Sequence, residues 1–274
     1  FDMKVALTGA NGFVGSHLMK IFTNNVVINR NDTEEQILKK LDGVYAVFNL
    51  AGAPIIKRWS KAYKKVLLSS RIDTTKKIVN AINKSDVKYF ISTSAIGAYP
   101  DGAAFDDDYE GYGDDFLGSL TSQWEEEANK CTKLTTVVRF GVILGSDGGA
   151  LVQMLPPFKL GVGGIIGDGK MMTSWIDIED LVRIYEYILQ TQLTGIINAT
   201  APNPVTNYVF TKALGKQLHR PTLFPLPEFV LKLLFGEGAT VLTGSKEVYP
   251  KRLLESGFEF KYKEINSSLA HHLS

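Results

Sequence analysis

Short, almost wholly apolar runs alternate with helical patterns in the first half of the chain, and this alternation most constrains the fold. The runs cover residues 5–8, 25–30, 45–50, 87–92 and 135–140. Between them, apolar residues recur at helical spacing over 12–22, 33–41, 61–82 and 120–129. Strands without polar alternation are buried on both faces, as in a parallel sheet covered by helices. The sequence therefore predicts an α/β fold with a doubly wound parallel sheet.

The pattern changes after about residue 145. Glycine and proline become frequent over residues 156–169, a helix is expected over 179–189, and a strand over 196–199 returns to the sheet. We expect a dinucleotide-binding Rossmann domain over residues 1–150, rejoined by about 176–200. A smaller, discontinuous C-terminal substrate lobe is expected over residues 151–274, closing over the carboxyl edge of the sheet.

A glycine-rich turn of pattern G-x-x-G-x-x-G lies between the first strand and the first helix. One glycine permits the tight bend, another lets backbone N–H groups reach a diphosphate, and a third lets the helix pack close to the sheet. The helix N-terminus adds the positive end of the helix dipole. The turn therefore predicts dinucleotide binding. Its predicted cofactor-binding residues are Gly9, Asn11, Gly12, Phe13, Val14 and Gly15.

The tip of the second strand indicates which dinucleotide binds. An acidic residue there would bind the ribose 2′-hydroxyl of NAD(H), but the chain has Arg30 between two asparagines. Arginine suits the 2′-phosphate of NADP(H), so NADP(H) is the predicted cofactor and NAD(H) the less favoured one. A solvated arginine at a strand end is the alternative. After the third strand, Leu50, Ala51 and Gly52 are predicted to pass close to the adenosine side.

Composition excludes several other classes of protein. The net charge of +1 does not favour a nucleic-acid partner, and no apolar stretch approaches the ~20 residues of a membrane span. The one cysteine, Cys131, cannot form a disulfide within the chain, which favours the cytoplasm. The histidines have no ligand spacing typical of a metal site. A small-molecule substrate is the expected partner, and a homodimer is left open.

Three segments, 8–15, 49–52 and 92–94, resemble the extended short-chain dehydrogenase/reductases, the nucleoside-diphosphate-sugar epimerase group of the NAD-dependent epimerase/dehydratase family. Four others, 57–59, 124–126, 154–158 and 250–258, are similar to atypical epimerase-family proteins whose C-terminal lobe is a domain of unknown function. The resemblance covers nearly the whole chain. It implies a Rossmann domain, an NADP-type cofactor and a substrate lobe, without assigning a substrate.

The proton-transfer residues of that family are only partly present. Typical members carry a Ser, a Tyr-x-x-x-Lys pair and an upstream Asn, and the resemblance implies that Ser94 is the catalytic Ser. When the positions are assigned from the segment around Trp124, Leu117 stands where Tyr is expected and Thr121 where Lys is expected. Arg71 takes the position of the upstream Asn. Leucine cannot transfer a proton and threonine cannot lower a phenol's pKa by charge, so the usual relay is missing.

Three functions remain open, of which the third is a structural oligomeric scaffold that retains no cofactor. The leading expectation is an atypical NADP(H)-dependent oxidoreductase or epimerase-like enzyme for a nucleotide sugar or small carbonyl compound, in which Ser94 orients the substrate. Tyr99, Tyr109 and Tyr112 are candidates to replace the missing tyrosine. The alternative is a non-catalytic NADP(H)-binding redox sensor or interaction module. The basic turn at 57–59 either contacts an anion or is a solvated turn with a packed tryptophan.

Overall fold

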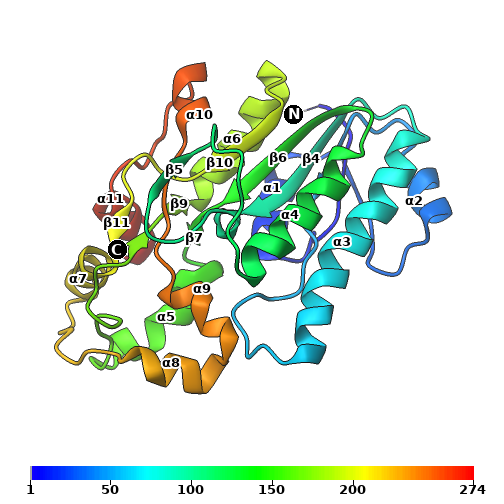
Figure 1. Ribbon diagram of the computed structural model, residues 1–274. Coiled ribbons are helices and arrows are strands. Elements are labelled where there is room, and N and C mark those ends of the chain that lie inside the picture. The colour runs from blue at the N-terminus through cyan, green and yellow to red at the C-terminus, as the bar shows by residue number, and fades with distance from the viewer. Residues whose placement is uncertain (1) are drawn as a thin grey trace.

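A parallel sheet of six strands forms the centre of the computed structural model, which describes residues 2–274 (Figure 1). Its order is β10-β6-β4-β3-β1-β2, and all neighbours are parallel. The doubly wound α/β fold is therefore confirmed. The strands are β1 (Val5–Leu7), β2 (Asn25–Val27), β3 (Ala46–Asn49), β4 (Tyr89–Ala95), β6 (Leu134–Phe140) and β10 (Gly195–Ala199).

Helices cover both faces of this sheet because successive strand residues point to opposite sides. Val5 and Leu7 pack in one core, whereas Ala6 packs in another on the opposite face. Figure 1 shows α3 and α4 in front of the sheet and α1 and α6 behind it. The helices are α1 (Phe13–Ile21), α2 (Glu34–Lys40), α3 (Lys61–Asn83), α4 (Phe116–Asn129) and α6 (Ile178–Thr191).

The direction in which strands are added reverses between β1 and β3. From β1 the chain goes first to β2 on one side and then to β3, β4, β6 and β10 on the other. In open α/β sheets, ligands bind outside the carboxyl ends of the strands at this reversal. The ends of β1 and β3 therefore mark where a dinucleotide site is to be sought.

Most of the remaining elements form a lobe at the carboxyl edge of the sheet, at the lower left of Figure 1, whereas α10 (Lys251–Ser256) lies beside β10 at the top. Three short strand pairs, β7–β9, β8–β11 and β5–β12, join segments of this part of the chain to one another. Because β10 lies in the main sheet, the sheet and lobe segments alternate along the chain, and the division at residue 150 stays a prediction. The elements are β5 (Ala104–Asp106), β7 (Val142–Leu144), α5 (Gly149–Lys159), β8 (Met172–Thr173), β9 (Trp175–Asp177), β11 (Val205–Thr206), α7 (Asn207–Leu218), α8 (Glu228–Phe235), α9 (Thr240–Thr243), β12 (Glu247–Tyr249), α10 (Lys251–Ser256) and α11 (Ile265–Leu273), with 3-10 turns η1 (Ile96–Ala98) and η2 (Glu237–Ala239).

Three element boundaries differ from those expected. Helix α4 begins at Phe116 rather than near residue 120, because the Asp115 carboxylate accepts a hydrogen bond from the Gly118 N–H at 2.9 Å and caps the helix. Strand β2 ends at Val27, and Arg30 lies in a turn beyond it. Strand β4 continues to Ala95 and so contains Ser94. Among the helices of residues 2–274, none has the length and apolarity needed to cross a bilayer.

The buried carboxylate of Asp177 joins the sheet domain to the C-terminal helix. It caps α6 by accepting from the Glu179 N–H at 2.9 Å. It also accepts from the Ser268 hydroxyl at 2.6 Å and lies 2.9 Å from His272 Nε2, both on α11. Since Asp177 and Ser268 are both fully buried, α11 is fixed to β9 and α6 by polar contacts as well as by packing.

We expect Ser268→Ala to lower the free energy of unfolding by about 1–3 kcal/mol, because it removes a hydrogen bond to a buried charge. Urea denaturation measures the change. Ser267→Ala is the matched control, since the Ser267 hydroxyl is exposed and bonds only the nearby Glu264 carbonyl. Equal effects of the two substitutions would contradict the assigned role of Asp177.

Candidate functional site

The glycine turn is held close to both the neighbouring strand and the first helix. Gly9 has φ +67°, and a side chain there would place Cβ 2.9 Å from the Leu50 carbonyl oxygen. At Gly15, Cβ would lie 2.2 Å from the Gly9 carbonyl oxygen. Larger residues at these positions would therefore separate the turn from β3 and from the start of α1. The structure brings together the two segments that the sequence assigned to the cofactor, 9–15 and 50–52.

The N-terminus of α1 carries backbone N–H groups suited to a diphosphate. Gly12 is the N-cap and supplies no side chain to cap the helix, and the first turn contains no acidic residue. The Ser16 N–H forms the first bond of the helix, to the Gly12 carbonyl at 3.0 Å. The N–H groups of Phe13, Val14 and Gly15 precede that bond and have no partner within the helix. Such a cradle fits an anion.

A buried polar network fixes the end of β3 beside this turn. The Thr8 hydroxyl donates to Asn49 Oδ1 at 2.8 Å and accepts from the N–H groups of Leu50 and Ala51 at 3.0 and 3.2 Å. The Asn49 amide in turn donates to the Thr75 hydroxyl on α3 at 2.9 Å. The backbone at Leu50 and Ala51 is thereby held by β1 and α3 together. Sequence reasoning did not identify Thr8 or Asn49 as the residues that do this.

The side chain of Phe13 packs away from the turn. Its ring lies against the glycines of the loop 145–149 and meets the His17 ring edge-on at 5.2 Å. His17 Nε2 lies 2.9 Å from a carboxylate oxygen of Asp147 in the same loop. Among the predicted cofactor residues, Phe13 can thus offer a ligand its backbone N–H, while Asn11 and Gly12 are exposed at the mouth of the turn.

The tip of β2 carries unneutralised positive charge. Arg30 is exposed, and its carbonyl accepts a hydrogen bond from the Lys77 ammonium at 3.2 Å, which brings a second cation to the tip. The nearby carboxylate of Asp32 is occupied by Lys40 at 2.5 Å and by the Asn29 N–H at 2.7 Å. Although burial acts to raise it, these contacts lower the pKa of Asp32. Lys77 comes from α3 and was not predicted.

Ser94 belongs to a buried polar cluster on the face covered by α4. Its hydroxyl donates to Glu125 Oε1 at 2.6 Å. Arg139 binds the same carboxylate through two N–H groups at 2.7 and 2.8 Å, and the Tyr112 hydroxyl donates to it at 2.6 Å. Ser94, Glu125 and Arg139 are each only 1% exposed. The hydroxyl proton of Ser94 is therefore directed inward, and its oxygen keeps lone pairs as an acceptor. The catalytic role of Ser94 stays a prediction.

The charges of this cluster stabilise its protonated groups. Burial, with the hydrogen bond to Glu125 and its charge, raises the pKa of Tyr112 to about 12, so the phenol remains neutral near pH 7. Although burial acts against it, the bond to Glu125 raises the pKa of Arg139 above its ordinary value. Tyr99 is fully buried and donates to Asn198 Oδ1 at 2.7 Å. Neither tyrosine has the lowered pKa of the family's acid/base tyrosine.

The positions of the missing pair on α4 are both buried. Leu117 is apolar, and the Thr121 hydroxyl donates to the Leu117 carbonyl of its own helix at 2.7 Å. The third candidate tyrosine, Tyr109, packs on Phe105 with ring centroids 4.4 Å apart. These positions supply no acid/base pair. No group of three or more His, Cys, Asp or Glu side chains that could hold a metal occurs in residues 2–274.

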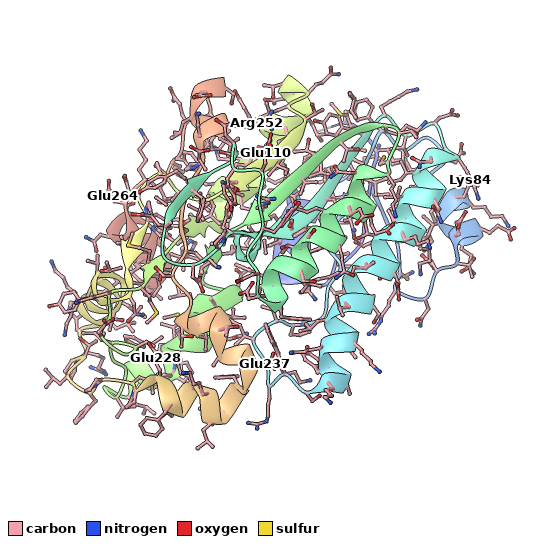
Figure 2. All side chains as sticks on the ribbon, in the orientation of Figure 1. Lys84, Glu110, Glu228, Glu237, Arg252 and Glu264 are labelled. Carbon is pink, nitrogen blue, oxygen red and sulfur yellow. The ribbon has the colours of Figure 1, made fainter. Side chains whose placement is uncertain are left out.

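The basic turn at 57–59 lies against the C-terminal lobe. Trp59 is buried and donates to the Ile55 carbonyl at 2.9 Å, and Arg58 donates to the Leu233 carbonyl at 2.6 Å. Just beyond, Lys64 forms an ion pair with Glu237, which Figure 2 labels where the lobe meets α3. These contacts favour the packed-tryptophan interpretation and make the turn a junction between the two parts of the molecule.

Known proteins with this combination of fold and turn were identified by comparison. A family model described as the NAD dependent epimerase/dehydratase family matches residues 5–115, and a domain of unknown function, DUF1731, matches residues 226–272. The epimerase family protein SDR39U1 homolog, chloroplastic, of Arabidopsis thaliana is 39% identical over 98% of this chain and 86% of its own length. Epimerase family protein YfhF of Bacillus subtilis is 33% identical, covering 98% and 97%.

A solved structure agrees along the whole chain. The crystal structure of human epimerase family protein SDR39U1 (isoform 2) with NADPH matches with a TM-score of 0.91 and 32% identity, covering 99% of both chains. The sheet and the glycine turn thus define a Rossmann protein of the epimerase type. The chain belongs to the family of epimerase family proteins that includes SDR39U1 and YfhF. The family resemblance seen in the sequence is confirmed.

We expect Glu125→Ala to lower the free energy of unfolding by about 3–5 kcal/mol, because it leaves Arg139 buried without a counter-charge. Thermal or urea unfolding measures the loss. Glu126→Ala on the exposed face of α4 is the control and should change little. The ion pair would not have the stabilising role assigned here if both variants unfolded like the wild type.

Proposed function

We propose that this protein binds NADP(H) along the carboxyl edge of its sheet and acts as an oxidoreductase or epimerase-like enzyme. The uncapped N-terminus of α1, above the turn made by Gly9 and Gly15, is the observation that carries this proposal. NADPH in the crystal structure of the human relative, which matches over 99% of this chain, supports it.

Each part of the edge would hold one part of the cofactor. The N–H groups of Phe13, Val14 and Gly15 would bind the diphosphate, since anions are stabilised at helix N-termini. Arg30 and Lys77 would bind the 2′-phosphate by charge-assisted hydrogen bonds. The backbone at 50–52, held by Thr8, would lie against the adenosine side. No free carboxylate at the β2 tip selects for NAD(H), because Asp32 is bound to Lys40.

Catalysis in this proposal relies on position more than on a strong acid or base. The bound cofactor would supply the hydride chemistry, since NADP⁺ accepts a hydride from a carbinol and NADPH returns one to a carbonyl, and the protein would provide the geometry. The Ser94 oxygen would accept a hydrogen bond from a substrate hydroxyl, which would orient the carbinol of a nucleotide sugar or the reduced form of a small carbonyl compound. Glu125 holds the Ser94 side chain in place, and Tyr112 donates to the same carboxylate. The half-buried free thiol of Cys131 fits a reducing compartment such as the cytoplasm.

A non-catalytic NADP(H)-binding module is the second candidate. It is favoured by Leu117 and Thr121 at the positions of the missing pair and by the inward hydrogen bond of Ser94. Two hollows in the surface, of about 340 and 480 Å³, lie at η2–α9 and beside β5, and neither is lined by the glycine turn or Ser94.

NADPH oxidation over a panel of carbonyl compounds and nucleotide sugars separates the two candidates. The enzyme proposal expects turnover with at least one compound and a loss of about tenfold or more in kcat for Ser94→Ala, with unchanged NADPH affinity. Ser119→Ala, on the exposed face of α4, is the control. Tight NADPH binding without turnover of any compound would contradict the enzyme proposal and support the non-catalytic binding module.

We expect Arg30→Ala to weaken NADPH binding by about tenfold or more and NADH binding little, because only NADPH has the 2′-phosphate. Fluorescence titration with both nucleotides measures the ratio of their dissociation constants. Lys77→Ala should reduce the same preference, and Arg30→Lys should retain part of it. An unchanged NADPH-to-NADH ratio in Arg30→Ala would show that the arginine is merely solvated.

A further inference from the structure

Arg71 is a buried cation on α3 at the carboxyl edge of the sheet. It is 8% exposed, and its guanidinium lies 5.2 Å from the centre of the Trp124 ring. One turn further along α3, the Thr75 hydroxyl accepts a hydrogen bond from Asn49 at the carboxyl end of β3. Arg71 precedes Thr75 by one turn on a helix that runs back from this edge, so it lies one turn nearer the edge. Arg71 therefore lies at the carboxyl edge of the sheet, on the β3 side.

No carboxylate neutralises this arginine. Its hydrogen bonds go to two backbone carbonyls, of Ala53 at 2.9 Å and Leu67 at 3.3 Å, and no ion pair to it is found in residues 2–274. Glu125, next to its stacking partner Trp124, is bound to Arg139 instead. Burial lowers the pKa of the Arg71 guanidinium to about 10, which leaves it charged at pH 7. A buried charge without a counter-ion destabilises the fold.

The guanidinium of Arg71 has unused N–H donors and lies beside an exposed glycine. An arginine has five N–H donors, and Arg71 uses two of them for the carbonyls. Its Cζ would lie 3.1 Å from a Cβ built on Gly52, and Gly52 itself is exposed. On this side the neighbour of the cation is therefore an exposed glycine without a side chain. Asn49 on β3 is paired with Ser92 on β4, so Gly52 and Ser94, which follow them, both lie toward the carboxyl ends of the two neighbouring strands.

We propose that Arg71 recognises an anionic group, a carboxylate or a phosphate, on the substrate that lies over Gly52 and Ser94. This inference rests on the proposed function and adds the substrate's charge to it. The diphosphate of the cofactor has its own binding groups in the free N–H groups of α1. A guanidinium forks onto carboxylate or phosphate oxygens through paired N–H donors, as a lysine cannot. The substrate would complete the ion pair that the folded chain lacks.

The test titrates citrate and inorganic pyrophosphate by calorimetry into the full chain saturated with NADP⁺, which keeps the diphosphate site occupied. Wild type should bind at least one of these anions saturably. Arg71→Met should weaken that binding by about tenfold or more, and Arg71→Lys by less. Arg58→Met, which removes an exposed charge from the same edge, should leave the anion affinity within about threefold of that of wild type. The NADP⁺ affinity should stay unchanged in all variants.

A second readout separates recognition from a structural role. Removing an uncompensated buried cation should leave the melting temperature of unliganded Arg71→Met equal to or above that of wild type. The proposal is overturned if wild type binds neither anion, if Arg71→Met keeps its anion affinity, or if only its NADP⁺ affinity falls. Should wild type fail to bind NADP⁺, the proposed function fails, and the same titrations of cofactor-free protein still test Arg71.

Discussion

The start of α1 is the part of the structure on which the rest of the account depends. Its first backbone N–H groups have no partner in the helix and no capping side chain, and they lie at the reversal point of the sheet. Gly15 makes this placement possible by allowing the helix to approach the Gly9 carbonyl. Uncapped donors are costly in a folded protein unless water or a ligand satisfies them. The turn therefore combines a packing constraint with an affinity for anions.

The chain keeps the glycine turn of the epimerase family but lacks the Tyr-x-x-x-Lys pair that transfers protons in typical members. The Thr8–Asn49 network holds the cofactor edge in place. At the position of the proton-transferring pair, α4 has Leu117 and Thr121, and its buried charge is Glu125, bound to Arg139. This carboxylate accepts the hydroxyl protons of Ser94 and Tyr112. The positive charges of Lys77 and Arg71, both on α3, lie near this edge of the sheet.

The fold was readable from the sequence because its strands are apolar on both faces and its first turn needs glycine. The same reasoning located residues 9–15 and 50–52 beside each other. It could not find the Glu125–Arg139 pair, since charged residues are normally solvated and nothing local marks these two as partners. Lys77 reaches Arg30 across 47 positions, a contact that only tertiary packing creates. The start of α4 was misjudged because the cap at Asp115 precedes the apolar pattern.

Amide hydrogen exchange at Phe13, Val14 and Gly15, measured with and without NADPH, tests the central claim most directly. If these N–H groups bind the diphosphate, their exchange should slow markedly on adding NADPH, while amides of the distant helix α8 keep their rates. Unchanged exchange at all three amides in protein saturated with NADPH would contradict the account, because the nucleotide would then be held elsewhere.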